Sequence, residues 1–170
     1  MTSNELRALL EQISHGDRAA FEALYHEFKV PVYTVLVRIT RDRVLSEDLL
    51  QEFFLKLFRT PPVDAKNPRA YLFQMAHNLA LDALRREKST DELNEAFSPS
   101  TAGIPYTQLE LELAFSDLPL PERQIAALHL YAGLKFREIA EICGMSLGTV
   151  LWRYRKAITQ LQQHLNGGTE

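Results

Sequence analysis

The sequence predicts an all-α protein of two small helical domains joined by an acidic, flexible linker. Apolar residues recur at helical spacing through most of the 170 residues, and nothing pairs convincingly with the one strand-like stretch. Residues 89–118 contain six acidic and no basic side chains, with Pro, Gly and Ser clustered between 98 and 105. We therefore expect domains at 1–88 and 108–170 and a linker at 89–107. A surface loop within one domain is the alternative.

The composition is that of a soluble globular protein, with 46% hydrophobic and 24% charged residues and a formal net charge of −3. No apolar stretch reaches the roughly 18 residues that span a bilayer, and the first residues do not resemble a secretory signal. The single cysteine, Cys143, excludes an internal disulfide and a multi-thiolate metal site. We expect an intracellular protein without membrane insertion.

Three helical stretches are expected in the first 40 residues. The first follows Ser3, a candidate N-cap, and the second follows Asp17. Residues 32–39 are rich in β-branched side chains and resemble a strand. A lone strand would leave its backbone groups without partners, so we predict a helix there, kinked or broken at Pro31.

The most amphipathic helix is expected over residues 45–59, with Ser46 as its N-cap. Leu55 lies on its polar face, where no part of its own domain would cover it. An exposed leucine among charged side chains indicates a partner surface. The apolar stripe on the opposite side is expected to be buried: Leu45, Leu49, Leu50, Phe53, Phe54, Leu57 and Phe58.

A loop at residues 60–66 precedes the last helix of the first domain. Asn67 is a candidate N-cap and Pro68 suits the first helical position, so this helix is predicted to run to about Lys88. The two arginines at 85–86 either contact phosphate or satisfy the helix C-terminus.

The second domain is predicted to contain a helix–turn–helix. A helix is expected at 108–118, and the Pro-Leu-Pro-Glu sequence at 119–122 is expected to start another that continues through 124–132. A short helix at 136–142 then leads to Gly144, which suits a left-handed turn. Ser146 can then cap a second, basic helix. This spacing is typical of a motif whose second helix reads the DNA major groove. An ordinary helical hairpin with a solvated basic face is the alternative.

Three segments, in this order, resemble a bacterial RNA polymerase sigma factor of the extracytoplasmic-function group. SEDLLQEFFLKLF at 46–58 is similar to the family's core-polymerase-binding helix, and RAYLFQMAHNLALDALRRE at 69–87 to its promoter-melting and minus-10 segment. Residues 118–161 are similar to its minus-35-reading domain. The resemblance implies that 1–88 is sigma region 2, that 108–170 is sigma region 4, and that the chain is an alternative sigma factor directing transcription initiation.

The resemblance implies three sets of contact residues, all numbered in this sequence. Contacts with core polymerase are expected from Asp48, Gln51, Glu52, Leu55 and Lys56. Contacts with minus-10 DNA are expected from Val63, Lys66, Asn67, Tyr71, Gln74 and Asn78. Contacts with minus-35 DNA are expected from Arg137, Ser146, Leu147, Gly148, Thr149, Trp152, Arg153 and Lys156.

The sequence departs from the family's pattern at the start of the recognition helix. After Gly-Thr-Val the family has a basic and then a small polar residue, whereas this chain has Leu151 and Trp152. One expected phosphate or base contact is therefore missing. Trp152 would pack on a sugar or a thymine methyl, or contact another protein, and the minus-35 sequence stays open.

No phosphate-binding loop, HExxH motif or clustered metal ligand is present, so we expect neither an enzyme nor a cofactor. The resemblance also implies cytoplasmic location and an anti-sigma partner. Two other functions stay open. One is a polymerase-independent regulator that binds an operator as a dimer, and the other is a helical interaction protein that has lost DNA binding.

Overall fold

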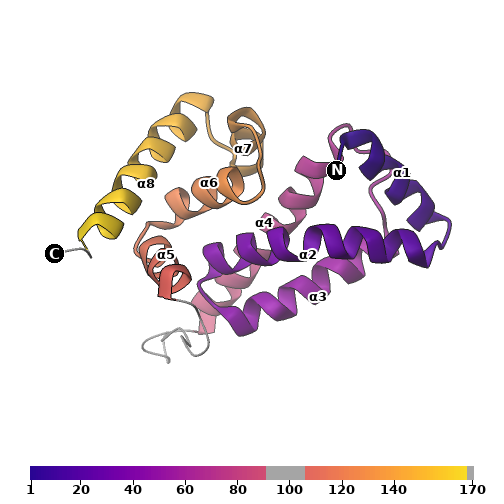
Figure 1. Cartoon of the computed structure of the whole chain (residues 1–170), viewed down its shortest axis with the longest axis horizontal. Helices are drawn as coiled ribbons and strands as arrows, with labels where there is room; N and C mark the ends of the chain where they lie inside the picture. Colours follow the sequence, from indigo (N-terminus) through magenta and orange to yellow (C-terminus); the bar gives the residue numbers. More distant parts are fainter. Residues whose placement is uncertain (91–105, 168–170) are drawn as a thin grey trace.

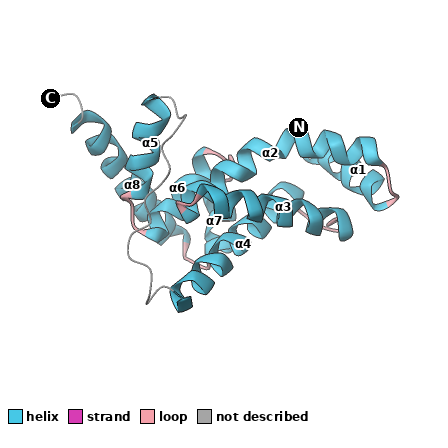
Figure 2. Cartoon of the chain, turned by 90° about the horizontal axis from the view of Figure 1, so that it is seen from below, coloured by secondary structure: helices cyan, strands magenta, loops and turns pink. Residues whose placement is uncertain are grey.

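The computed structural model describes residues 1–90 and 106–167. That part of the chain contains eight helices and no strand (Figures 1 and 2), which confirms the all-α prediction. The N-terminal half consists of α1 (Ser3–Ser14), α2 (Arg18–Thr40), α3 (Arg43–Arg59) and α4 (Pro68–Thr90). The C-terminal half consists of α5 (Tyr106–Ser116), α6 (Leu120–Leu130), α7 (Phe136–Cys143) and α8 (Leu147–Gly167). Most of the expected linker lies outside the described residues.

The first two helices begin at side-chain caps. Thr2, not the predicted Ser3, caps α1, because its hydroxyl accepts the Glu5 N–H at 3.2 Å while the Glu5 carboxylate accepts the Thr2 N–H. This reciprocal pair satisfies two of the free amides at the helix start. Asp17 caps α2 as predicted, accepting the Ala20 N–H at 3.1 Å.

The start of α3 differs from the sequence prediction. Asp42 caps this helix by accepting the Leu45 N–H at 3.0 Å, so the helix begins two residues before the expected position. Ser46 lies inside the helix and is fully buried, and its hydroxyl hydrogen-bonds to that of Thr40 at 2.8 Å. Ser46 therefore does not cap α3 but links the C-terminal end of α2 to the first turns of α3.

Helix α2 is the centre of the molecule and is continuous through Pro31. It contacts α1, α3, α4, α5 and α6, so apolar side chains are needed on several of its faces rather than on one stripe. This explains why residues 32–39 resemble a strand in composition and still form a helix. Four of these side chains are fully buried: Val32, Val35, Leu36 and Ile39.

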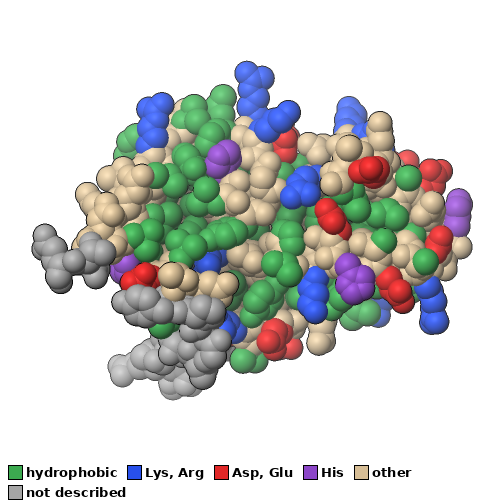
Figure 3. Space-filling view, in the orientation of Figure 1, with side chains coloured by type: hydrophobic (Ala, Val, Ile, Leu, Met, Phe, Trp, Pro, Cys, Tyr) green, Lys and Arg blue, Asp and Glu red, His purple; other side chains and the backbone are tan. Residues whose placement is uncertain are grey.

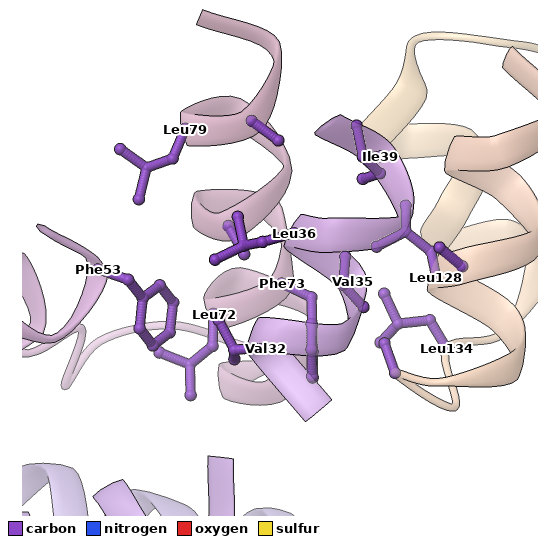
Figure 4. Close-up of a cluster of buried hydrophobic side chains, with 14 of the residues drawn as sticks. Val32, Val35, Leu36, Ile39, Phe53, Leu72, Phe73, Leu79, Leu128 and Leu134 are labelled. Carbon is purple, nitrogen blue, oxygen red and sulfur yellow. The ribbon is translucent and has the colours of Figure 1, made fainter. Parts of the chain in front are cut away.

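The two halves of the chain share one hydrophobic core. In Figure 4, Val35 and Ile39 of α2 lie against Leu128 of α6 and against Leu134, which follows α6. All four side chains are buried, with at most 2% of their surface exposed. The halves therefore pack directly on each other, rather than lying apart as two bodies joined only by a linker.

The helix–turn–helix forms as the sequence predicts. Gly144 has a φ of +66°, in the left-handed region, and the Met145 N–H donates to the Ala140 carbonyl at 3.0 Å, which closes the C-terminus of α7. The helix before it, α6, begins at Leu120, within the predicted start at 119–122, because Pro121 suits its first turn. None of the helices at residues 1–90 and 106–167 combines the length and the apolar character that a bilayer crossing needs.

Candidate nucleic-acid and protein interfaces

The outward face of α3 presents the five residues expected to bind core polymerase. Asp48, Gln51, Leu55 and Lys56 are exposed and Glu52 is half-buried, with 53% of Leu55 accessible. The Glu52 carboxylate lies 3.6 Å from the Lys56 ammonium, a weak pair at this exposure. The inner face fixes the orientation of this surface because its side chains are buried: Leu49, Phe53, Phe54 and Leu57.

Two more apolar side chains are exposed on the same face of α3. Val44 is 73% exposed and Phe58 is 51% exposed. Phe58 lies one turn after Leu55, and Val44 lies on the same side of the helix about three turns before it. The prediction that Phe58 is buried was wrong. Its ring contacts Phe21 of α2 edge-on, with centroids 5.3 Å apart, and this contact covers only one side. Val44 was missed because the helix was expected to begin after it.

The start of α4 holds the expected minus-10 residues. The Asn67 side chain accepts the Ala70 N–H at 3.2 Å, which confirms its predicted role as a cap. In the preceding loop, Val63 is 41% exposed and Lys66 is exposed. The loop is tied to α1, because the Arg7 guanidinium donates to the Lys66 carbonyl.

Tyr71, Gln74 and Asn78 share the outward face of α4. They are spaced by three and four residues, which places them in one row on a helix, and all three are exposed. The opposite face is buried in the core through Leu72, Phe73, Ala76, Leu79 and Ala80. The row therefore combines one aromatic ring with two amides in a fixed orientation.

The first turn of α8 is stabilised by hydroxyl groups. Ser146 accepts the Thr149 N–H at 3.2 Å and donates to the Thr149 hydroxyl at 2.8 Å, so both hydroxyls have local partners. Leu147 is 36% exposed. Apart from its chain neighbours and the backbone of its own helix, no atom lies within 4 Å of the position that a Cβ on Gly148 would take, so the backbone there is open to close approach.

Trp152 is the most prominent side chain on α8. It is 57% exposed, with the Lys156 ammonium 5.2 Å and the Arg153 guanidinium 5.8 Å from its ring. Arg155 is also exposed on this helix, and sequence reasoning did not select it although its charge was visible there. Arg137 is exposed on α7.

Arg153 has a partner inside the protein. Its guanidinium donates to the Glu122 carboxylate at 3.0 Å, and Glu122 in α6 is 1% exposed. Removing one member of a buried ion pair leaves the other charge uncompensated, so this contact fixes α8 on α6. The sequence predicted Arg153 as a DNA contact because its partner Glu122 lies 31 residues away, and no local pattern pairs the two.

Charge on the molecular surface is unevenly spread. On the face shown in Figure 3, basic side chains project along the edge over α7 and α8, and acidic side chains gather over α1 and α2.

The described residues offer neither a reactive thiol nor a metal site. Burial raises the pKa of the Cys143 thiol to about 11, so this group stays protonated at neutral pH. Within the described ranges, no group of three or more His, Cys, Asp or Glu could hold a metal ion.

Comparison with known proteins identifies both halves. Residues 24–90 match the family model of Sigma-70 region 2, and residues 108–161 match that of Sigma-70, region 4. The chain is 29% identical over 178 residues to the ECF RNA polymerase sigma factor SigK of Mycobacterium ulcerans, covering 96% of this chain and 95% of that protein. It is 28% identical over 179 residues to SigK of Mycobacterium bovis, with the same coverage.

Two solved structures share the fold. One is the sigma factor RpoE in complex with the anti-sigma factor NepR from Bartonella quintana (TM-score 0.64, 20% identity), which covers 85% of this chain and 98% of that one. The other is CnrH in complex with the cytosolic domain of CnrY (TM-score 0.65, 21% identity), which covers 96% and 98%.

Both family models match in the predicted order, and the helix–turn–helix lies within the second of them. Sigma factors are transcription initiation factors and not enzymes. The chain therefore belongs to the sigma-70 family as an extracytoplasmic-function member, an alternative sigma factor that binds core RNA polymerase and directs transcription initiation.

Proposed function

We propose that the outward face of α3 is the main contact with core polymerase. The observation that carries this proposal is the exposure of Leu55 among Asp48, Gln51 and Lys56 on a helix whose other face is buried. Apolar contact through Leu55 supplies affinity, and the surrounding charges set register and partner choice. Val44 and Phe58 extend the apolar part of this surface.

The outward row of α4 and the loop before it bind minus-10 DNA in this proposal. Opening a promoter requires the protein to hold unstacked bases of a single strand, and aromatic rings do this by stacking. Tyr71 supplies such a ring, while Gln74 and Asn78 can donate to and accept from base edges. Lys66 supplies charge for the backbone, and Val63 and Asn67 complete the site.

The start of α8, with Arg137 of α7, binds the minus-35 element. Leu147, Gly148 and Trp152 lie where a recognition helix meets the major groove, and Ser146 and Thr149 hold its first turn. Lys156 and Arg137 supply phosphate contacts. Arg153 acts mainly through Glu122, by fixing the helix that carries Trp152.

The chain acts in the bacterial cytoplasm, where its polymerase is found, and an anti-sigma factor is its regulatory partner. The two solved structures of similar fold are complexes with NepR and with the cytosolic domain of CnrY, which supports such a partner. An anti-sigma factor would block transcription by covering the α3 face, the start of α8, or both.

Run-off transcription tests the proposal. Core polymerase from the source bacterium is given a template containing the DNA upstream of this protein's own gene, with or without the chain. We expect initiation that depends on the chain and is lost when Asp48→Ala and Leu55→Ala are combined.

The matched control combines Glu22→Ala with Val30→Ala, because both residues are exposed on α2. This control should transcribe like the unmodified protein. Tight operator binding by the chain alone, without polymerase binding, would contradict the proposal and favour a polymerase-independent regulator.

A further inference from the structure

The loop between α3 and α4 contains three of the residues proposed to bind minus-10 DNA. Val63, Lys66 and Asn67 are all exposed, so burial of their side chains does little to hold them in place. A segment with few buried contacts is mobile unless its backbone is fixed in another way. The conformation of this loop therefore depends on the hydrogen bonds of its backbone.

Both ends of the loop are fixed locally. At its start, the Thr60 N–H donates to the Lys56 carbonyl of α3 at 2.9 Å, and the two prolines at 61–62 have restricted φ angles. At its end, the Asn67 side chain caps α4. The residues between these anchors, 63–66, are left with more freedom.

A side chain of α1 holds this freer part of the loop. The Arg7 guanidinium donates to the Lys66 carbonyl, which lies 59 residues away in the sequence, and the connection from α3 to α4 runs past α1 (Figure 1). Within residues 1–90 and 106–167, Arg7 belongs to none of the ion pairs. The contact that its guanidinium makes in this structure is the one with the loop.

Helix α1 gives the Arg7 side chain a fixed starting point. The residue before it, Leu6, is 2% exposed, and Leu10 and Ile13 on the same inner face are also buried. The helix begins at the reciprocal cap described above and contacts both α2 and α4. The backbone from which Arg7 reaches the loop is therefore held by the core of the N-terminal half.

The bond from Arg7 orients one peptide group of the loop. A trans peptide is planar, and its C=O and N–H point in opposite directions. Because the Lys66 carbonyl is directed toward Arg7, the Asn67 N–H is directed away from it. Lys66 and Asn67 lie on either side of this peptide, so the bond restricts where both residues lie relative to α4.

We propose that Arg7 is a positioning residue for promoter opening, which holds the Lys66–Asn67 peptide so that the loop can receive an unpaired nucleotide of the minus-10 element. The inference rests on the proposed function, because it uses the assignment of this loop to minus-10 DNA. The Sigma-70 region 2 model matches residues 24–90, so Arg7 lies outside the segment that identifies this half of the chain. Helix α1 thus contributes to the minus-10 site without contacting DNA itself.

The physical effect of Arg7 is preorganisation. Ordering a mobile loop when DNA binds loses conformational entropy and weakens binding. A loop that is already held by a charged donor loses less entropy at that step. A fixed loop also discriminates better between bases, because it cannot shift to accommodate the wrong one.

A direct contact between Arg7 and a DNA phosphate is the competing role, since the side chain is exposed. The two roles differ in how they combine with changes in the loop. A phosphate contact acts independently of Lys66, so the effects of Arg7→Ala and Lys66→Ala would multiply. A positioning residue acts through the loop, so the double variant would be little worse than Lys66→Ala alone.

The experiment uses holoenzyme assembled from the full chain and core polymerase, on the DNA upstream of this protein's own gene. Permanganate reactivity of unpaired thymines follows open-complex formation. We expect Arg7→Ala to slow it about threefold to tenfold and to reduce the preference for the natural minus-10 element over templates with single base changes. Affinity for core polymerase and the urea midpoint of the free chain should not change.

Two further variants serve as controls. Arg18→Ala removes the same charge from an exposed arginine at the first position of α2 and should leave open-complex formation and base preference unchanged. Arg7→Lys keeps a charged donor on a long side chain and should recover most of the activity that Arg7→Ala loses.

The outcomes separate the role of Arg7 from the proposed function. Equal behaviour of Arg7→Ala and Arg18→Ala, or effects of Arg7→Ala and Lys66→Ala that multiply, overturns the positioning role while the holoenzyme still transcribes. A loss of base preference that Arg7→Lys does not restore also overturns it. Absence of initiation with the unmodified chain overturns the proposed function and the role of Arg7 together.

Discussion

The outward faces of α4 and α8 are both proposed to bind DNA, yet the fold uses their polar groups differently. On α4, Tyr71, Gln74 and Asn78 are neutral and project outward from a helix whose other side is in the core. On α8, Arg153 is ion-paired with buried Glu122, and the first-turn hydroxyls cap the helix. Much of the polar chemistry of α8 therefore maintains structure.

This difference matches what each surface has to recognise. Unpaired bases present their faces, and a neutral row with one ring can stack on them and hydrogen-bond with their edges. A closed duplex presents phosphates and groove edges, so a recognition helix needs fixed orientation and cations at its sides. The Glu122–Arg153 ion pair holds α8 on α6 and so fixes this orientation.

The largest expected effect is a difference in stability between variants of Arg153 and of Lys156, which lie one turn apart on α8. Arg153 is ion-paired with buried Glu122, whereas Lys156 is exposed. Arg153→Met leaves the buried Glu122 carboxylate without its partner and should lower the free energy of unfolding by about 2–3 kcal/mol. Lys156→Met changes an exposed side chain and should alter it by less than about 0.5 kcal/mol. Urea unfolding followed by circular dichroism measures both. Equal destabilisation by the two variants would show that the ion pair has no structural role.

The second-largest effect is expected in promoter opening, on changing the outward row of α4 formed by Tyr71, Gln74 and Asn78. Combining Tyr71→Ala with Asn78→Ala removes a stacking ring and a base-edge amide, and open-complex formation should fall about tenfold or more. Permanganate reactivity of unpaired thymines at the minus-10 element measures this. Tyr71→Phe keeps the ring and should retain most of the activity. A loss of activity in Tyr71→Phe as large as in the alanine variant would assign the role to the hydroxyl and not to stacking.

Local chemistry made much of the fold predictable from the sequence. Asp17, Asn67 and Gly144 occupy the cap and turn positions that their side chains or backbone favour. The cap of α3 was mispredicted because Asp42 and Ser46 are both good cap residues one turn apart. Only the burial of Ser46 against Thr40 decides between them, and that contact is made by another helix.

Contacts between distant residues were not predictable. One partner of the Arg123 guanidinium is the Ile39 carbonyl, 84 residues away, and a carbonyl carries no sequence signature. Glu112 was read as part of an acidic stretch, whereas it is held between two arginines of the other half. For the site, a helical pattern correctly placed Leu55 and Tyr71 outward, but it could not show that Arg153 is engaged with α6.

A smaller effect is expected from Trp152, where this chain departs from its family. Trp152→Ala removes an exposed ring flanked by Lys156 and Arg153, and we expect about fivefold weaker transcription from a template with the natural minus-35 element, since an aromatic contact is worth about 1 kcal/mol. Stability should not change. Run-off transcription on templates with single changes in the minus-35 element shows which base loses its preference. Unchanged selectivity at every base would rule out the thymine methyl contact and leave a sugar or another protein as the partner of Trp152.

The smallest effect concerns His77, which lies where the α4 row meets the C-terminal half. Burial lowers the pKa of His77 below its usual 6.5, opposed in part by hydrogen bonding to Gln124 and Asn78. The unfolded chain therefore takes up a proton at a higher pH than the folded chain, and stability falls as the pH drops below 6.5. His77→Gln removes this titration, so the difference in urea midpoint between the variant and the unmodified protein should shift in the variant's favour from pH 7.5 to pH 5.5. A constant difference across that range would show that His77 has the same pKa in the folded and unfolded states. His77 would then not make the stability of the protein depend on pH.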